Sequence, residues 1–172
     1  MRRACWIVAV LATAVFTGWA EPAPAQGPAT IASGATKIAR WELYASAPRP
    51  GRHCVGMRLE QLWAGPAPAR RERCGARRLA RGAVTLQTLA APGMGSFAYG
   101  RAGRKVVQVS VTVGDRAAVT VATLPSPLGG RDRFWVAQAG LSCAAVKVQA
   151  LGVRAGARGA RRSGRIGPAG CG

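Results

Sequence analysis

The residues of this chain that could do chemistry are few, and the densest group of them is a run of arginines. Guanidinium groups hold phosphate and carboxylate groups through paired hydrogen bonds, so a dense arginine run is typical of a loop that binds a polyanion. The alternative is a solvated loop in a chain whose composition favours arginine. The run contains six arginines and a single glutamate: Arg70, Arg71, Glu72, Arg73, Arg77, Arg78 and Arg81.

The only histidine, His53, lies beside Cys54, and Cys74 follows it along the chain. A structural zinc site needs four such ligands, usually arranged in CxxC pairs, and the sequence contains no CxxC pair. We therefore expect neither a metal nor any other cofactor.

A Ser–His–acid site would have to use His53 together with Asp115 or Asp132, and the glycines around Ser96 do not form a nucleophile elbow. We expect a secreted or envelope-associated binding or structural protein that catalyses no reaction and whose ligand the sequence does not identify. A polyanion-binding protein that uses the arginine run and an arginine-rich tail is the alternative. A small hydrolase is the weakest alternative.

The charge of the chain favours anionic partners. Its 172 residues include 25 Lys+Arg against 6 Asp+Glu, a formal net charge of +19. A GC-rich coding sequence accounts for the preference of arginine over lysine, but it does not account for so few acidic residues. The excess of positive charge is therefore a physical property of the protein and not a by-product of codon usage. Anionic envelope polymers or a membrane surface are the expected partners. A specific nucleic acid is not expected, because only Trp63 lies near the run to stack on bases.

The first 25 residues are typical of a secretory signal peptide. Arg2 and Arg3 precede an apolar run that extends to about residue 20, and Ala23-Pro24-Ala25 satisfies the small-x-small rule for cleavage before Gln26. Cleavage after Ala20 is an alternative, and an uncleaved amino-terminal membrane anchor is another. We expect a secreted or extracytoplasmic protein.

The exported chain would retain four of the five cysteines, and an even number in an oxidising compartment indicates disulfides. Three pairings are open. We favour Cys54 with Cys74, because these residues flank an irregular stretch rich in proline and arginine, and closing a loop of that length stabilises by about 3 kcal/mol. Cys143 would then pair with Cys171, although Cys171 lies close to an end of the chain that we expect to be mobile.

From residue 37 onward, apolar and polar residues alternate with a period of two, which predicts β-strands with one buried face. We expect no amphipathic helix of useful length. The prediction is an all-β fold, a small antiparallel β-sandwich of immunoglobulin-like size, with a small barrel as the alternative. The adjacent residues Phe134 and Trp135 should face opposite sides of their strand, which would leave one of them exposed. About eight short strands are expected, near residues 40–45, 54–59, 84–87, 97–99, 105–113, 117–124, 133–139 and 146–151.

Two segments fall outside this alternation. Residues 26–36 are rich in small residues and are expected to form a linker, and residues 154–172 are expected to be a disordered, arginine-rich tail that includes Arg161 and Arg162. The folded domain would then span residues 37–153. We expect the arginine run and this tail to bind anionic surfaces without forming a specific site, so affinity should fall steeply with salt.

In the order of these features, the chain resembles a group of uncharacterised exported β-sandwich proteins from GC-rich actinobacteria. The resemblance covers about residues 38–153, and it implies a secreted globular domain with one disulfide and no assigned activity. The matching features are Trp41-Glu42-Leu43, Cys54, Cys74-Gly75, Phe97-Ala98-Tyr99-Gly100, the valines at 107–113 and Arg133-Phe134-Trp135-Val136.

Overall fold

The computed structural model describes residues 26–63, 67–76, 78–140, 145–152 and 160–165. Every regular element in these ranges is a β-strand, and all strand pairs are antiparallel. None of the described residues forms a helix long and apolar enough to cross a membrane. The strands are β1 (Gln26–Ala35), β2 (Ala39–Arg49), β3 (Arg52–Gln61), β4 (Ala69–Ala76), β5 (Gln87–Ala91), β6 (Gly95–Ala102), β7 (Gln108–Val113), β8 (Val119–Ala122), β9 (Leu124–Pro125), β10 (Arg133–Gly140), β11 (Ala145–Leu151) and β12 (Arg161–Arg165).

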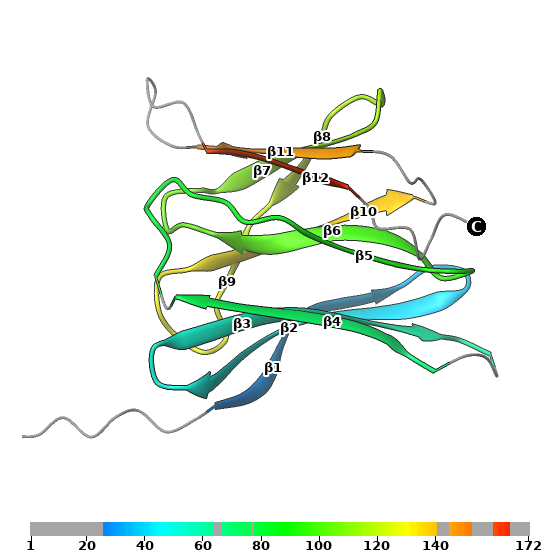
Figure 1. Ribbon diagram of the computed structural model, residues 1–172, viewed down its shortest axis with the longest axis horizontal. Coiled ribbons are helices and arrows are strands. Elements are labelled where there is room, and N and C mark those ends of the chain that lie inside the picture. The colour runs from blue at the N-terminus through cyan, green and yellow to red at the C-terminus, as the bar shows by residue number, and fades with distance from the viewer. Residues whose placement is uncertain (1–25, 64–66, 77, 141–144, 153–159, 166–172) are drawn as a thin grey trace, which may run out of the picture.

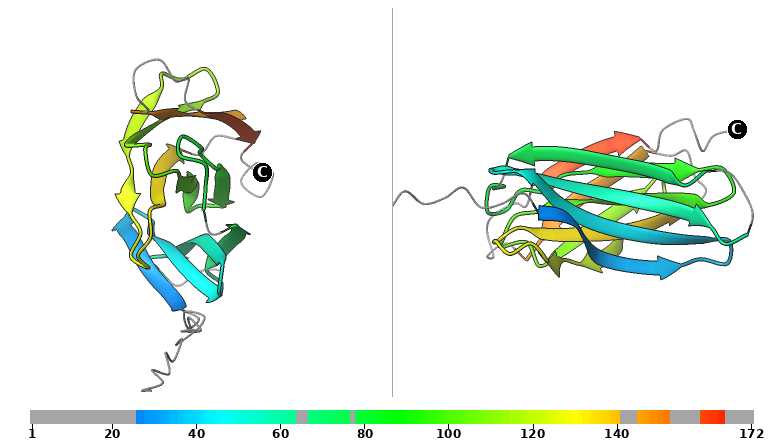
Figure 2. Two further views of the ribbon diagram at one scale, coloured as in Figure 1. Left: turned by 90° about the vertical axis from the view of Figure 1, so that its left-hand side faces the viewer. Right: turned by 90° about the horizontal axis from the view of Figure 1, so that it is seen from below.

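These strands form three four-stranded sheets stacked in layers (Figures 1 and 2). The N-terminal sheet has the order β1-β2-β3-β4, the middle sheet β5-β6-β10-β9, and the C-terminal sheet β12-β11-β7-β8. The prediction of an all-β antiparallel sandwich is confirmed. The described residues contain twelve strands rather than about eight, and the sandwich has a third layer.

The middle sheet packs against a hydrophobic core on each of its faces. Large side chains of β6 and β10 meet the N-terminal sheet on one face, and smaller residues with Trp135 meet the valines of β7 and β11 on the other. All eight residues of β6 are therefore buried. The first core includes Leu43, Met57, Leu59, Phe97, Tyr99 and Phe134, and the second includes Ala98, Trp135, Val109, Val111, Val146 and Val148.

The double coverage of the middle sheet corrects the expectation that Phe134 or Trp135 would be exposed. The two side chains do point to opposite faces of β10, but both are fully buried, each in a different core. Alternation predicted the faces correctly. It could not predict that both faces are covered.

The expectation of a linker at residues 26–36 is wrong, because most of this segment is strand β1. It pairs with β2 in a register that places Gly34 opposite Trp41. A Cβ on Gly34 would lie 2.7 Å from the Trp41 indole ring, so only glycine lets the ring pack there. The small residues that suggested a linker permit this close approach.

The stretch between Cys54 and Cys74 was expected to be irregular, but it contains most of strand β4. Strand β4 pairs with β3 so that Cys54 lies directly opposite Cys74. The disulfide between them is confirmed, with Cα atoms 3.9 Å apart. The bridge therefore joins two neighbouring strands rather than closing an irregular loop.

The tail predicted to be disordered contains β12, which pairs with β11 at Gln149↔Arg161 and Val148↔Arg162. Ala160 also donates its backbone N–H to the Gly82 carbonyl oxygen, 3.4 Å away. The expected end of the folded domain at residue 153 is therefore too early. The predicted signal peptide at residues 1–25, Arg77, Cys143 and Cys171 lie outside the described residues.

Candidate anion-binding site

A cleft of about 610 Å³ opens at the end of the middle sheet, where β6 ends and β10 begins. Its walls come from four parts of the chain: the start of β3, the segment between β4 and β5, the β6–β7 turn and the loop before β10. We call it the arginine cleft. Its lining residues are His53, Arg78, Leu79, Arg81, Arg104, Gly129, Gly130, Arg131 and Asp132.

Two glycines allow the segment that carries Arg78 and Arg81 to run against the end of β6. A Cβ on Gly100 would lie 2.1 Å from the Thr85 carbonyl oxygen, and one on Gly103 would lie 2.1 Å from the Ala80 carbonyl oxygen. Backbone hydrogen bonds from Gly103 to Ala83 (2.8 Å) and from Lys105 to Arg81 (3.1 Å) hold the segment in place. The segment that carries Arg78 and Arg81 is therefore held in a defined position at the side of the cleft.

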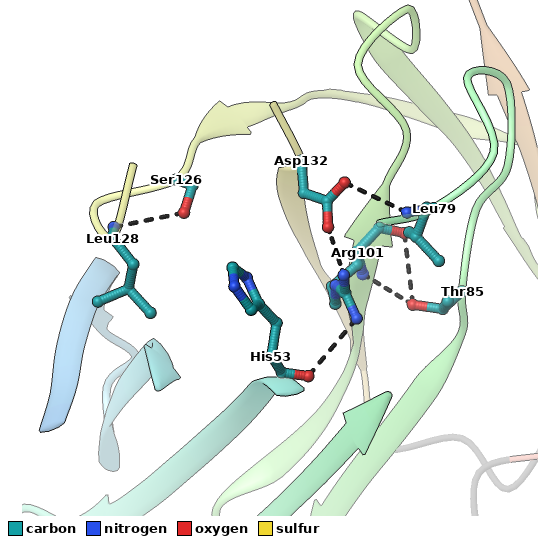
Figure 3. Close-up of polar contacts among 7 residues, drawn as sticks. All are labelled: His53, Leu79, Thr85, Arg101, Ser126, Leu128 and Asp132. Carbon is teal, nitrogen blue, oxygen red and sulfur yellow. Dashed lines mark hydrogen bonds and ion pairs between the residues drawn. The ribbon is translucent and has the colours of Figure 1, made fainter. Parts of the chain in front are cut away.

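A buried ion pair ties the walls together. The Arg101 guanidinium contacts the Asp132 carboxylate, and both side chains are nearly inaccessible to solvent (Figure 3). The other Asp132 oxygen accepts the Leu79 backbone N–H at 3.4 Å, and Arg101 also donates to the His53 carbonyl oxygen at 3.5 Å. One ion pair thus connects β6, the loop before β10, the β4–β5 segment and β3.

The loop before β10 turns sharply to bring Arg131 to the cleft. Gly129 and Gly130 have φ angles of 71° and 94°, in the left-handed region that favours glycine. Upstream, the Ser126 hydroxyl accepts the Leu128 backbone N–H at 3.3 Å (Figure 3). This loop leads directly into Asp132, so its position is coupled to the buried ion pair.

Four cations gather around the arginine cleft without an acid to neutralise them. Among the residues that the structure describes, Arg78, Arg81, Arg104 and Arg131 form no ion pair, and Asp132 is committed to Arg101. The charge of Arg81 lowers the pKa of Arg104, and desolvation and the charges of Arg131 and Arg78 lower it further. Mutual repulsion of this kind is relieved when an anion binds between the cations.

The other arginines of the predicted run that the structure describes have different surroundings. The Arg70 guanidinium lies over the Tyr44 ring, 5.1 Å from its centroid, and is paired with Glu72 at 3.2 Å. Arg71 donates to the Thr88 carbonyl oxygen at 3.0 Å and so links β4 to β5. These two arginines serve the fold, whereas Arg73 is exposed on β4 beside a second cleft.

Arg161 and Arg162 of β12 lie on the C-terminal sheet and do not line the arginine cleft. Arg161 and Arg162 line a shallow groove of about 390 Å³ that also includes Lys147 and the hydroxyls of Ser110 and Thr112. The predicted anion-binding residues that the structure describes are thus brought together only in part: Arg78 and Arg81 share the arginine cleft, and Arg73 and Arg162 share the second cleft. Arg70, Arg71 and Arg161 line neither cleft.

Arg104 and Arg131 were not predicted as site residues, because each stands apart from the dense run in the sequence. Arg104 follows β6 and Arg131 precedes β10, and these strands are antiparallel neighbours whose register pairs Ala102 with Arg133. Both arginines follow turn glycines. Only the pairing of β6 with β10, which the sequence does not display, places them at the same end of the middle sheet.

Among the residues that the structure describes, one group of possible metal ligands lies close together: Cys54, Glu72 and Cys74, whose donor atoms lie within 4.8 Å of one another. Both sulfurs are joined in the disulfide, so neither is available as a thiolate ligand. His53 does not join this group but lines the arginine cleft, half-buried.

Comparisons with known proteins find no family model, no curated protein and no solved structure that matches this chain. The resemblance to exported actinobacterial β-sandwich proteins stays a prediction.

Proposed function

We propose that this chain is a non-catalytic binding protein of the extracytoplasmic space and that its arginine cleft binds an anionic group of the ligand. The observation that carries the proposal is the convergence of Arg78, Arg81, Arg104 and Arg131 on one cleft whose carboxylate is already paired. Positive charge concentrated in a concave site attracts anions more strongly than the same charge on an open surface.

The lining residues favour binding over catalysis. Four guanidinium groups supply hydrogen-bond donors for an oxyanion, whereas the Asp132 carboxylate is buried against Arg101 and supports the walls. The lining includes neither a hydroxyl nor a thiol side chain that could act as a nucleophile.

An extracytoplasmic location fits the Cys54–Cys74 disulfide, because such bonds persist in oxidising compartments. It also fits the amino-terminal sequence, with its basic start, apolar run and small-residue cleavage motif. The ligand classes that agree with this location are anionic envelope polymers and anionic membrane surfaces.

The proposal is tested by titrating the protein with tripolyphosphate in a calorimeter at low salt. We expect Arg104→Gln and Arg131→Gln each to weaken binding by about tenfold or more, because each removes charge-assisted hydrogen bonds. Arg116→Gln is the matched control, since it removes the same charge from the exposed β7–β8 turn. Equal affinities for the wild type and all three variants would show that the cleft is not the binding site.

A further inference from the structure

A second cleft, of about 350 Å³, lies beside the arginine cleft. It opens along the edge of β5, between β4 of the N-terminal sheet and β12 of the C-terminal sheet, which lie on either side of β5 in Figure 1. We call it the edge cleft. Its lining residues are Arg73, Cys74, Gly75, Leu79, Thr85, Leu86, Gln87, Arg101, Arg162 and Ser163.

The two clefts adjoin at Leu79, which lines both of them. The buried ion pair lies at the same boundary, because Asp132 lines the arginine cleft and Arg101 lines the edge cleft. The Leu79 backbone N–H is bonded to Asp132, so the boundary is fixed in position.

The edge cleft continues the positive surface. Arg73 and Arg162 are exposed and approach it from different sheets, and its lining contains no carboxylate. The nearest acid of β4, Glu72, is bonded to Arg70 and to the Ser46 hydroxyl. A ligand leaving the arginine cleft over Leu79 therefore meets two more cations and no opposing charge.

A ligand that uses both clefts must carry several anionic groups along its length. His53 is the only ring side chain in either lining, and neither lining contains a Trp, Tyr or Phe side chain on which a base or a sugar ring could stack. What the clefts offer repeatedly is the planar guanidinium group, whose donors match two oxygens of a phosphate.

We infer that the ligand is a flexible chain of phosphate groups that lies across the arginine cleft and the edge cleft, with Arg73 and Arg162 binding the part that extends beyond Leu79. This inference rests on the proposed function, since the arginine cleft is its first contact. The recognised feature is a repeated phosphate, whether in a polyphosphate or in a polyol-phosphate polymer.

The test compares tripolyphosphate with a longer linear polyphosphate, binding to the full exported chain at the same salt concentration. We expect the longer chain to bind at least tenfold more tightly, because the second cleft is then engaged by a tethered group. Arg73→Gln/Arg162→Gln should remove most of that gain and leave tripolyphosphate affinity unchanged. The control Arg40→Gln/Arg116→Gln loses the same charge from exposed positions outside both clefts and should retain the gain.

The outcomes separate the two proposals. If tripolyphosphate binds through Arg104 but chain length has no effect, the inference fails and the proposed function stands. If neither phosphate compound binds, both fail. A glycerol-phosphate polymer that binds as tightly as polyphosphate supports the repeated phosphate as the recognised group. Tighter binding of heparin or of single-stranded DNA of equal charge would overturn it, because heparin carries sulfate groups in place of phosphates and DNA adds bases to them.

Discussion

Gly103 decides how closely the segment with Arg78 and Arg81 approaches the middle sheet. In Gly103→Ala the new Cβ would meet the carbonyl oxygens of Ala80 and Arg81 at 2.1 and 2.6 Å, so the segment must move away. We expect a loss of about 1–3 kcal/mol in the free energy of unfolding and weaker binding of tripolyphosphate. Urea denaturation and calorimetry measure the two effects.

The control for this substitution is Gly75→Ala. A Cβ on Gly75 would have only the Arg101 guanidinium near it, at 3.5 Å, which is an ordinary contact. Its unfolding free energy should stay close to that of the wild type. If Gly103→Ala is equally harmless, the close approach does not constrain the cleft.

Asp132 should matter more for stability than any other acid in the described chain. Asp132→Asn would leave the Arg101 guanidinium buried without its counter-charge, and breaking a buried pair in this way costs about 3–5 kcal/mol. The matched control is Glu60→Gln, which breaks the exposed pair with Arg58 and should cost less than about 1 kcal/mol. Similar losses in urea denaturation of the two variants would contradict a structural role for the pair.

Among the elements, β3 and β4 are joined both by backbone pairing and by the disulfide. Replacing Cys54 and Cys74 by alanine should lower the free energy of unfolding by about 3 kcal/mol, because the residues are 20 positions apart and the open chain has more freedom when unfolded. Non-reducing peptide mapping of the wild type should recover the two cysteine peptides as one linked species. Free thiols at both positions in exported protein would be the contrary result.

Strand β12 allows the effect on stability of losing a strand to be compared with the effect of losing only its charge. A chain ending at residue 160 loses the pairing of β12 with β11, and we expect it to be less stable by about 2 kcal/mol or more, since several ladder hydrogen bonds go with it. Arg161→Gln/Arg162→Gln keeps the strand and should change stability by less than about 0.5 kcal/mol. Thermal unfolding of both proteins checks this, and equal stability would mean that β12 adds nothing to the fold.

How well the sequence predicted an element depended on what its side chains contact. The alternation of Val55, Met57 and Leu59 identified β3, and that of Val109 and Val111 identified β7, because these side chains form the cores. Strands β1, β4 and β12 carry small or charged residues and are formed by pairing with a neighbour, so alternation did not reveal them.

The candidate site was predicted in part for a related reason. Arg78 and Arg81 belong to a dense local run, which a sequence displays directly. Arg104 and Arg131 reach the cleft only through the pairing of β6 with β10, a long-range feature that one sequence does not contain. The run of positive charge was therefore predictable from the sequence. The cleft that brings Arg104 and Arg131 close to that run was not.

For the molecule as a whole, the prediction that remains to be tested is export. Amino-terminal sequencing of protein recovered outside the cytoplasm should begin near Gln26, as the motif at Ala23-Pro24-Ala25 indicates. Cleavage there would keep β1 whole, because the strand starts at Gln26. An intact Met1 on protein extracted from membranes would instead support the uncleaved anchor.

The order of the sheets along the chain has a consequence for how the molecule is made. The N-terminal sheet is complete by residue 76, but the apolar face of Leu43, Met57 and Leu59 is covered by residues of β6 and β10. A nascent chain emerges amino-terminus first, so this sheet can pair its strands while its inner face still has no partner. Residues of β6 can cover part of that face once they emerge, but the cover is complete only after Phe134 has emerged. A chain stalled between residues 76 and 134 would therefore expose apolar surface and be more prone to aggregate than the complete chain.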